Sequence, residues 1–317
     1  VEEIIDLSSN INFIKPNVNV DFNELDISAY PNYEKLYNAI SSNYKTESNQ
    51  IELYNGGSSA IFSLFRHLKK KHCTIYSPAY LEYKKAANLF GYKISHINRL
   101  NILEQEVEEN SFVIFVNPST PDGQLYCIDE LMTYWMSRNC TILIDESFLD
   151  FTDGESMIKY IQEYDKLYIL KSMTKFYSSA GIRVGTLVSC EQNIVSLKKS
   201  EPMWKLSHFD SIYLQEALKD RSFKRVSKAI NVKNNLFLEK ILKESNLFSV
   251  VLTSNANFIL AKLKNMKANE FQNRLNAYKI LIRDCSNFDY LDDSYVRIAV
   301  KSEKHLKHFQ TALTSIT

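Results

Sequence analysis

The sequence predicts an α/β domain with a mostly parallel sheet, followed by a smaller α+β domain. Through the first two thirds of the 317 residues, short apolar runs alternate with amphipathic helical patterns. This alternation is typical of parallel strands joined by crossover helices. Several of the runs are apolar at every position, as expected for strands covered by helices on both faces of the sheet. The last third loses the alternation and mixes helices with short strands.

Five short apolar runs are the predicted strands of the first part: Cys73–Ser77, Phe112–Asn117, Thr141–Asp145, Leu167–Lys171 and Val184–Ser189. The helical patterns between them predict helices over Ser59–Lys71, Tyr80–Phe90 and Asp129–Asn139. Gly91 follows the second helix at the position where many helices end, and Asp129 is expected to cap the third.

The C-terminal third opens with one long helical pattern, over about Asp210–Ser245. After it we expect strands at Phe248–Leu252 and Asn257–Leu263, a helix near Lys267–Ala277, strands at Lys279–Arg283 and Tyr295–Val300, and a terminal helix. The change of pattern places a domain boundary near Trp204–Asp210.

Composition excludes several classes of protein. A formal net charge of +1 gives no general attraction to nucleic acid or acidic membranes, so we expect neither as a partner. No apolar run approaches the roughly 18–20 residues that span a bilayer, and the acidic start, VEEIIDLSSN, does not resemble a secretion signal. The five cysteines and six histidines form no metal-binding motif. We therefore expect a cytoplasmic protein with reduced cysteines in its core and no metal site.

Glycine is scarce, and most of the glycines fall near candidate sites. The chain has seven, where average usage would give about 22. Gly56 and Gly57, in Asn55-Gly56-Gly57-Ser58-Ser59, stand directly before a predicted helix. Backbone N–H groups at a helix N-terminus attract phosphate, and glycine lets the phosphate come close. A turn that only caps the helix explains the same residues.

Two further clusters follow predicted strands. Asn117-Pro118-Ser119-Thr120-Pro121-Asp122-Gly123 is a rigid loop where open α/β sheets place ligands, although it could be an ordinary tight turn. Asp145 ends another buried strand, where a carboxylate needs a partner. It could cap the next segment or hold a protonated ring nitrogen.

The last cluster contains Lys175, just past an apolar strand, in Ser172-Met173-Thr174-Lys175. Partial desolvation lowers a lysine's pKa and makes the amine a nucleophile toward aldehydes. Ser172 and Arg183 supply a hydroxyl and a forked guanidinium, both suited to a phosphate. Taken alone, a lysine at this position is more often a surface residue.

Together and in this order, the clusters resemble the fold-type I pyridoxal-phosphate (PLP) enzymes of the class I/II aminotransferase family. The similarity runs from Asn10-Ile11-Asn12 to Arg297-Ile298-Ala299-Val300, and it is greatest to histidinol-phosphate aminotransferases and L-threonine-O-3-phosphate decarboxylases. Three segments resemble the decarboxylases in particular: Asp145–Phe151, Leu170–Tyr177 and Ile282–Phe288.

The resemblance implies a role for each residue toward the cofactor, pyridoxal 5'-phosphate. Lys175 corresponds to the lysine that forms the Schiff base, and Asp145 to the partner of the pyridinium nitrogen. Tyr80 is expected to stack on the ring. The cofactor phosphate would be held by a set of four residues, Gly57, Ser58, Ser172 and Arg183.

The resemblance also implies substrate contacts and a dimer. Arg297 is expected to bind the substrate carboxylate and Arg283 a phosphate or second anion, with Asn10 and Asn12 bordering the site. Tyr30 would reach the cofactor phosphate of the neighbouring subunit in a homodimer. The implied divisions are an N-terminal segment, 1–28, that joins the small domain, a large PLP-binding domain, 29–207, and a small C-terminal domain, 208–317.

Two positions depart from the family pattern. Thr120 stands where the family usually has an asparagine that bonds the cofactor's phenolic oxygen, and Phe148 where many aminotransferases have a tyrosine with the same role. The decarboxylases share the phenylalanine. We therefore expect a decarboxylase that converts a small O-phosphorylated L-amino acid, phosphoserine or phosphothreonine, into an amino alcohol phosphate. The alternatives are an aminotransferase on a phosphorylated substrate and an inactive relative that works by binding.

Overall fold

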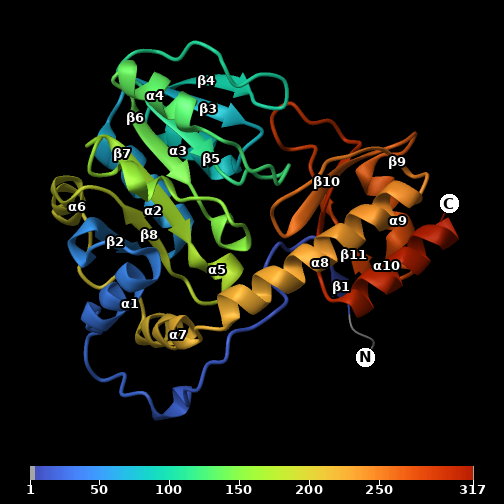
Figure 1. Ribbon diagram of the computed structural model, residues 1–317, viewed down its shortest axis with the longest axis horizontal. Coiled ribbons are helices and arrows are strands. Elements are labelled where there is room, and N and C mark those ends of the chain that lie inside the picture. Colours follow the sequence, from blue (N-terminus) through green and yellow to red (C-terminus); the bar gives the residue numbers. More distant parts are fainter. Residues whose placement is uncertain (1–3, 317) are drawn as a thin grey trace.

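A seven-stranded sheet forms the centre of the larger part of the molecule (Figure 1). The computed structural model describes residues 4–316, so Val1–Glu3 of the predicted N-terminal segment and Thr317 lie outside the described residues. The strand order is β2-β8-β7-β6-β5-β3-β4. Neighbours from β7 to β4 run parallel, while β8 is antiparallel to both β7 and β2. The predicted fold class, with a mostly parallel sheet, is confirmed.

Most strands of this part are followed by a helix, except that β5 follows β4 directly and only 3₁₀ turns separate β6 from β7. The strands are β2 (Ile51–Tyr54), β3 (His72–Ser77), β4 (Lys93–Asn98), β5 (Phe112–Val116), β6 (Thr141–Asp145), β7 (Leu167–Ser172) and β8 (Gly185–Val188). The helices are α1 (Glu34–Tyr44), α2 (Gly56–Leu68), α3 (Leu81–Leu89), α4 (Asp129–Ser137), α5 (Met173–Phe176), α6 (Glu191–Lys198) and α7 (His208–Lys219). Short 3₁₀ turns lie at Phe22–Glu24, Ser48–Gln50, Leu149–Phe151 and Met157–Tyr160.

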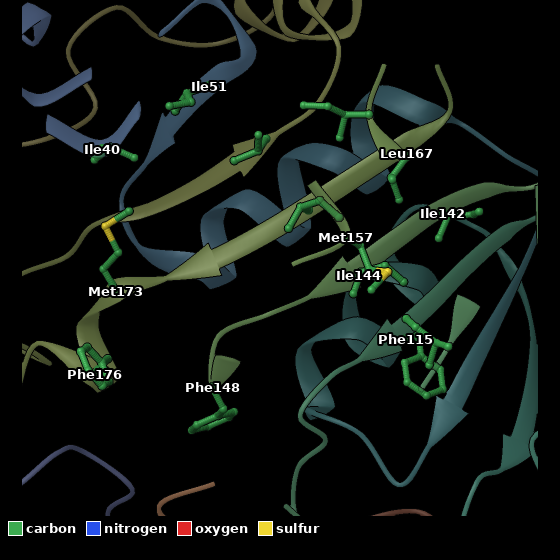
Figure 2. Close-up of a cluster of buried hydrophobic side chains, with 14 of the residues drawn as sticks. Ile40, Ile51, Phe115, Ile142, Ile144, Phe148, Met157, Leu167, Met173 and Phe176 are labelled. Atoms are coloured by element: carbon green, nitrogen blue, oxygen red, sulfur yellow. The ribbon is translucent and has the colours of Figure 1, made fainter. Parts of the chain in front are cut away.

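Both faces of the sheet are buried, which explains the continuously apolar strands. On β5, Val113 and Phe115 belong to one core cluster, while Ile114 belongs to the other. The first cluster includes side chains of α1, α4 and α7, and the second side chains of α2, α3 and α6. Figure 2 shows part of the first, where Phe115 and Ile144 come from neighbouring strands. Each fully buried side chain of this kind stabilises the fold by about 1.5–3 kcal/mol.

The smaller part is built on a four-stranded antiparallel sheet in the order β12-β13-β10-β9 (Figure 1). Its elements are α8 (Phe223–Glu244), β9 (Phe248–Val251), β10 (Phe258–Leu263), α9 (Ala268–Asn276), β11 (Ile280–Leu281), β12 (Arg283–Asp284), β13 (Tyr295–Ala299) and α10 (Glu303–Ile316). Near the N-terminus, β1 (Ile5–Asp6) pairs in parallel with β11. Ile5 and Leu7 therefore pack in the same core as α8, α9 and α10.

Three details of the predicted elements are wrong. The long helix expected over Asp210–Ser245 is two helices, because the Asp220 carboxylate accepts the N–H groups of Ser222 and Phe223 and starts α8 anew. The single strand expected at Lys279–Arg283 is divided between two sheets.

The third error concerns Asp129, which is the first helical residue of α4, after Ile128 as the cap. Its carboxylate instead accepts the Tyr160 hydroxyl, 2.5 Å away. The edge strands β2 and β4 were not predicted.

The helix α7 shows how closely the two parts join. It follows the proposed boundary at 208, yet Leu214 and Ala217 pack with α1 in the first core of the larger part. The next helix, α8, begins close to the C-terminal end of α7 and extends into the smaller part (Figure 1). We propose the division into 1–28, 29–207 and 208–317 for the chain as a whole, with α7 packed across it.

Candidate active site

A cavity of about 310 Å³ lies where the larger and smaller parts meet. It opens at the carboxyl ends of β5, β6 and β7 and at the start of α2, the edge at which α/β sheets hold ligands. All the predicted site residues line it except Tyr30 and Asn12. The remaining lining residues are Ile11, Ile61, Ser147, Phe148, Leu170, Thr174, Ala180 and Phe288.

Glycines let two backbone segments and one guanidinium meet at the start of α2. Gly56 has a φ of +80°, and a Cβ atom there would lie 2.4 Å from Nη2 of Arg183. A Cβ on Gly185 would lie 2.7 Å from the backbone nitrogen of Gly57. The side chain of Asn55 does not cap the helix, so the first N–H groups of α2 are not bonded by it. This arrangement forms a cradle that a side chain would fill and that suits a phosphate.

Lys175 lies in the cavity on α5, one turn beyond the end of β7. Its Nζ donates a hydrogen bond to the Ser172 hydroxyl at 3.4 Å and lies 5.0 Å from the centre of the Phe148 ring. Burial lowers the pKa of this amine, with Arg297 and Arg183 adding to the effect and Asp145 opposing it. The lysine is thus shifted toward the neutral, nucleophilic form.

The carboxylate of Asp145 lies at the end of β6 and is 6% exposed. Its Oδ1 accepts the backbone N–H of Ser147 at 2.8 Å and also the Ser147 hydroxyl, and its Oδ2 accepts the Tyr83 hydroxyl. Among the described residues, no basic side chain forms an ion pair with it. The carboxylate is therefore available to a cationic group of a ligand.

Tyr80 stands at the start of α3 with its ring partly open to solvent. Its hydroxyl lies 3.2 Å from the Ser58 hydroxyl, which belongs to the first turn of α2. The contact joins the expected ring-stacking residue to the cradle.

Arg297, on β13, reaches the loop that follows β5. Its Nη1 donates to the Thr120 hydroxyl at 3.2 Å, and its Nη2 donates to the backbone oxygen of Ser8 at 3.2 Å. Burial lowers the pKa of this guanidinium to about 10. Its Nε has no hydrogen-bond partner within the described chain, so the side chain retains a donor.

Arg283, on β12, lies beside Arg297 in strand register. It donates to the Asn287 side chain at 3.0 Å, and its guanidinium lies 5.7 Å from the centre of the Phe288 ring. No carboxylate of residues 4–316 forms an ion pair with it. The smaller part therefore presents two guanidinium groups to the cavity.

The N-terminal segment borders the cavity through Asn10, whose backbone oxygen accepts the Asn257 side chain at 2.8 Å. Asn12 does not line the cavity. It is buried, and its side chain bonds Phe176 and Ser227 at 2.8 and 2.6 Å. These hydrogen bonds of Asn12 connect the N-terminal segment to α5 and α8.

Tyr30 lies outside the cavity of its own chain. Its ring is 74% exposed and stacks on Trp204 with centroids 4.0 Å apart. No other described segment covers it.

Sequence reasoning missed two buried residues near the cavity. Tyr83 bonds Asp145 and lies one helical turn after Tyr80, but its buried ring gives it the sequence pattern of an ordinary core residue. Arg99 forms a buried ion pair with Asp122 at 3.2 Å and donates to the backbone oxygen of Thr120 at 2.7 Å. It follows the unpredicted strand β4, so no signal marked it.

The cavity fits pyridoxal 5'-phosphate. The glycine cradle with Ser58, Ser172 and Arg183 suits the phosphate, and the Asp145 carboxylate suits a protonated ring nitrogen. The Lys175 amine would then meet the aldehyde. The described residues contain no cluster of His, Cys, Asp or Glu placed to hold a metal, and none of their helices is long and apolar enough to cross a membrane.

Comparison with known proteins points the same way. The profile of the family described as aminotransferase class I and II matches residues 8–313. The threonine-phosphate decarboxylase of Salmonella typhimurium is 25% identical in an alignment that covers 99% of this chain and 92% of that protein.

Two solved structures are also similar over 99% of both chains. Histidinol-phosphate aminotransferase from Clostridium acetobutylicum has a TM-score of 0.87 with 27% identity, and L-threonine-O-3-phosphate decarboxylase from Porphyromonas gingivalis has a TM-score of 0.86 with 22% identity. Fold similarity therefore does not separate the two activities.

Proposed function

Because this chain belongs to the aminotransferase class I and II family, whose cofactor is pyridoxal 5'-phosphate, we propose that it decarboxylates a small O-phosphorylated L-amino acid. The product would be an amino alcohol phosphate. The observation that carries this proposal is the charge of the cavity. Its lining contains four basic residues, Lys175, Arg183, Arg283 and Arg297, and one acidic residue, Asp145.

Each basic residue can be matched to one group of the cofactor or of the substrate. Lys175 would hold the aldehyde carbon of the cofactor and move protons, and Arg183 in the cradle would hold the cofactor's phosphate. Two guanidinium groups remain, Arg297 and Arg283. A substrate with both a carboxylate and a phosphate satisfies both, whereas an ordinary amino acid leaves one unpaired in a partly buried site.

The bound cofactor supplies an electron sink for the pair of electrons released at the substrate's Cα. The chain decides which bond releases them, by how it holds the substrate. If Arg297 on the carboxylate and Arg283 on the phosphate place the bond from Cα to the carboxylate perpendicular to the cofactor plane, carbon dioxide leaves. The Phe148 ring, next to Lys175, offers an apolar wall, which favours loss of a charged carboxylate as a neutral gas.

An aminotransferase acting on a phosphorylated substrate is the second candidate. The similarity to the Clostridium acetobutylicum aminotransferase, at 27% identity over 99% of both chains, favours it. The same two arginines would then hold the Cα–H bond perpendicular, and Lys175 would take the proton.

We also propose a homodimer in which Tyr30 reaches the neighbouring site. Tyr30 and Trp204 form an exposed aromatic pair, and Ile27 and Met203 beside them in sequence are 65% and 75% exposed. An exposed aromatic pair with further exposed apolar residues near it in the sequence is typical of an interface between subunits. Sedimentation of wild type and of the Tyr30→Ala/Trp204→Ala variant tests the dimer, and a wild-type monomer would contradict it.

The activity is tested by mass spectrometry of the products from purified protein, PLP and O-phospho-L-serine or O-phospho-L-threonine, with and without 2-oxoglutarate. We expect an amino alcohol phosphate in both reactions. A keto product that requires 2-oxoglutarate would establish the aminotransferase instead.

A further inference from the structure

Asp145 is a buried carboxylate held by hydrogen-bond donors and not by a cation. Of its two oxygens, Oδ1 accepts both the backbone N–H and the hydroxyl of Ser147, while Oδ2 accepts only the hydroxyl of Tyr83. A carboxylate oxygen can accept about two hydrogen bonds. Oδ2 can therefore accept one more hydrogen bond while it accepts the Tyr83 hydroxyl.

The Tyr83 hydroxyl donates its hydrogen bond to Asp145. The side chain is fully buried, and its only hydrogen-bond partner among the described residues is Asp145. Burial raises the pKa of the phenol well above its usual value, and the neighbouring Asp145 raises it further. Both effects favour the protonated phenol, the form whose hydroxyl donates to Asp145.

The first turn of α3 brings Tyr83 and Tyr80 to the same place. The two residues are three positions apart, with ring centroids separated by 6.3 Å and planes at 90°. Tyr80 lines the cavity, where its ring can cover a flat ligand, and Tyr83 lies behind it on the carboxylate. Through this one helical turn, Tyr80 would cover the face of a bound ring, and Tyr83 would hold the carboxylate that meets its edge.

We infer that Tyr83, together with Ser147, is a positioning residue that fixes the Asp145 carboxylate and aims its Oδ2 at the ring nitrogen of the cofactor. Hydrogen bonds donated to a carboxylate stabilise its charged form. A carboxylate held against the ring nitrogen keeps that nitrogen protonated, which maintains the electron sink. This inference rests on the proposed pairing of Asp145 with the cofactor.

The test is the protonation state of the cofactor nitrogen, read by ¹⁵N NMR in protein reconstituted with ¹⁵N-labelled PLP and titrated with pH. The variants are Tyr83→Phe, Ser147→Ala and Asp145→Asn. Tyr92→Phe is the matched control, because Tyr92 is also a buried tyrosine and its hydroxyl donates to the Phe65 backbone oxygen at 2.8 Å, away from the cavity.

We expect the ring nitrogen of Tyr83→Phe to lose its proton at a pH lower by about one unit or more than in wild type. Ser147→Ala should shift in the same direction by less, because the backbone N–H remains, and Tyr92→Phe should match wild type. If Asp145→Asn moves the titration but Tyr83→Phe and Ser147→Ala do not, Tyr83 is only a packing residue and the inference is overturned.

If Asp145→Asn itself leaves the titration unchanged, the pairing of Asp145 with the cofactor is wrong and the inference falls with it. Should Tyr83→Phe not fold, Ser147→Ala decides: a shift supports the inference and a wild-type titration overturns it.

Discussion

The Arg297 guanidinium donates to the Thr120 hydroxyl across 3.2 Å, and this bond connects β13 of the smaller part to the loop after β5. A hydroxyl that accepts one hydrogen bond still has its own proton to donate. Thr120 can therefore orient Arg297 while its proton points elsewhere in the cavity. The position that departs from the family pattern thus has a partner in this chain.

Thr120→Val should weaken substrate binding while leaving the protein folded. The substitution keeps the shape but removes the acceptor for Arg297, a loss worth about 1 kcal/mol, or roughly a fivefold rise in KM. Steady-state kinetics on O-phospho-L-threonine measure this, with Thr120→Ser as the control that retains the hydroxyl. An unchanged KM in Thr120→Val would show that Arg297 is oriented by Ser8 alone.

Arg283→Ala should discriminate between phosphorylated and unphosphorylated substrates. A charge-assisted bond to phosphate contributes about 1.5–3 kcal/mol, so kcat/KM for the phosphorylated substrate should fall by roughly one to two orders of magnitude. The same variant with L-threonine should change little. Equal losses with both substrates would remove the phosphate assignment of Arg283.

Local sequence pattern points to the parts of this site that follow buried strands, whereas Arg283, Arg297 and Asn10 were predicted only through the resemblance to the family. Asp145 and Lys175 could be identified because an apolar strand, buried on both faces, leads directly to each of them. Arg99 follows β4, an edge strand in which half-buried and exposed residues dominate, so the strand carries no apolar signal.

Asn12 and Tyr83 show a second limit of sequence reasoning. The contacts of Asn12 join positions more than 160 residues apart, and no local pattern encodes them. In α3, Tyr83 reads as an ordinary core residue, because its ring is buried and only its hydroxyl reaches the site. Burial alone does not reveal where a polar tip points.

Arg99→Met should destabilise the protein by about 3–5 kcal/mol, because it leaves Asp122 buried without its cation. Both side chains of the pair are fully buried. Urea unfolding measures the loss, and the exposed pair Arg274 and Glu270 supplies the control, since Arg274→Met should cost less than about 0.5 kcal/mol. Equal losses in the free energy of unfolding would show that the buried Arg99–Asp122 pair contributes no more than the exposed Arg274–Glu270 pair.

Replacement of Lys175 should stabilise the cofactor-free protein in a pH-dependent way. Burial lowers the pKa of this amine below its usual 10.5, so between the two values the unfolded chain binds more protons than the folded one. Stability contributed by this group therefore rises with pH across that range. Lys175→Met removes the cost of burying the charge, so its gain should be larger at pH 7 than at pH 10.

Urea unfolding of wild type and Lys175→Met without PLP at the two pH values checks this. With PLP present, Lys175→Met should lose turnover and the absorbance of the lysine-bound cofactor. A gain in stability that is equal or greater at pH 10 would contradict the desolvation of Lys175.

Gly185→Ala should damage the phosphate cradle, whereas Gly181→Ala should not. A Cβ on Gly185 would lie 2.7 Å from the carbonyl carbon of Gly56 and from the nitrogen of Gly57, so the start of α2 would have to move. Beyond its chain neighbours, a Cβ on Gly181 would meet no atom within 4 Å. Gly181→Ala is therefore a matched control in the same segment. We expect PLP to bind at least about tenfold more weakly to Gly185→Ala, the loss of roughly one charge-assisted bond. Fluorescence titration of the cofactor-free proteins measures this, and wild-type affinity in Gly185→Ala would show that the phosphate lies elsewhere.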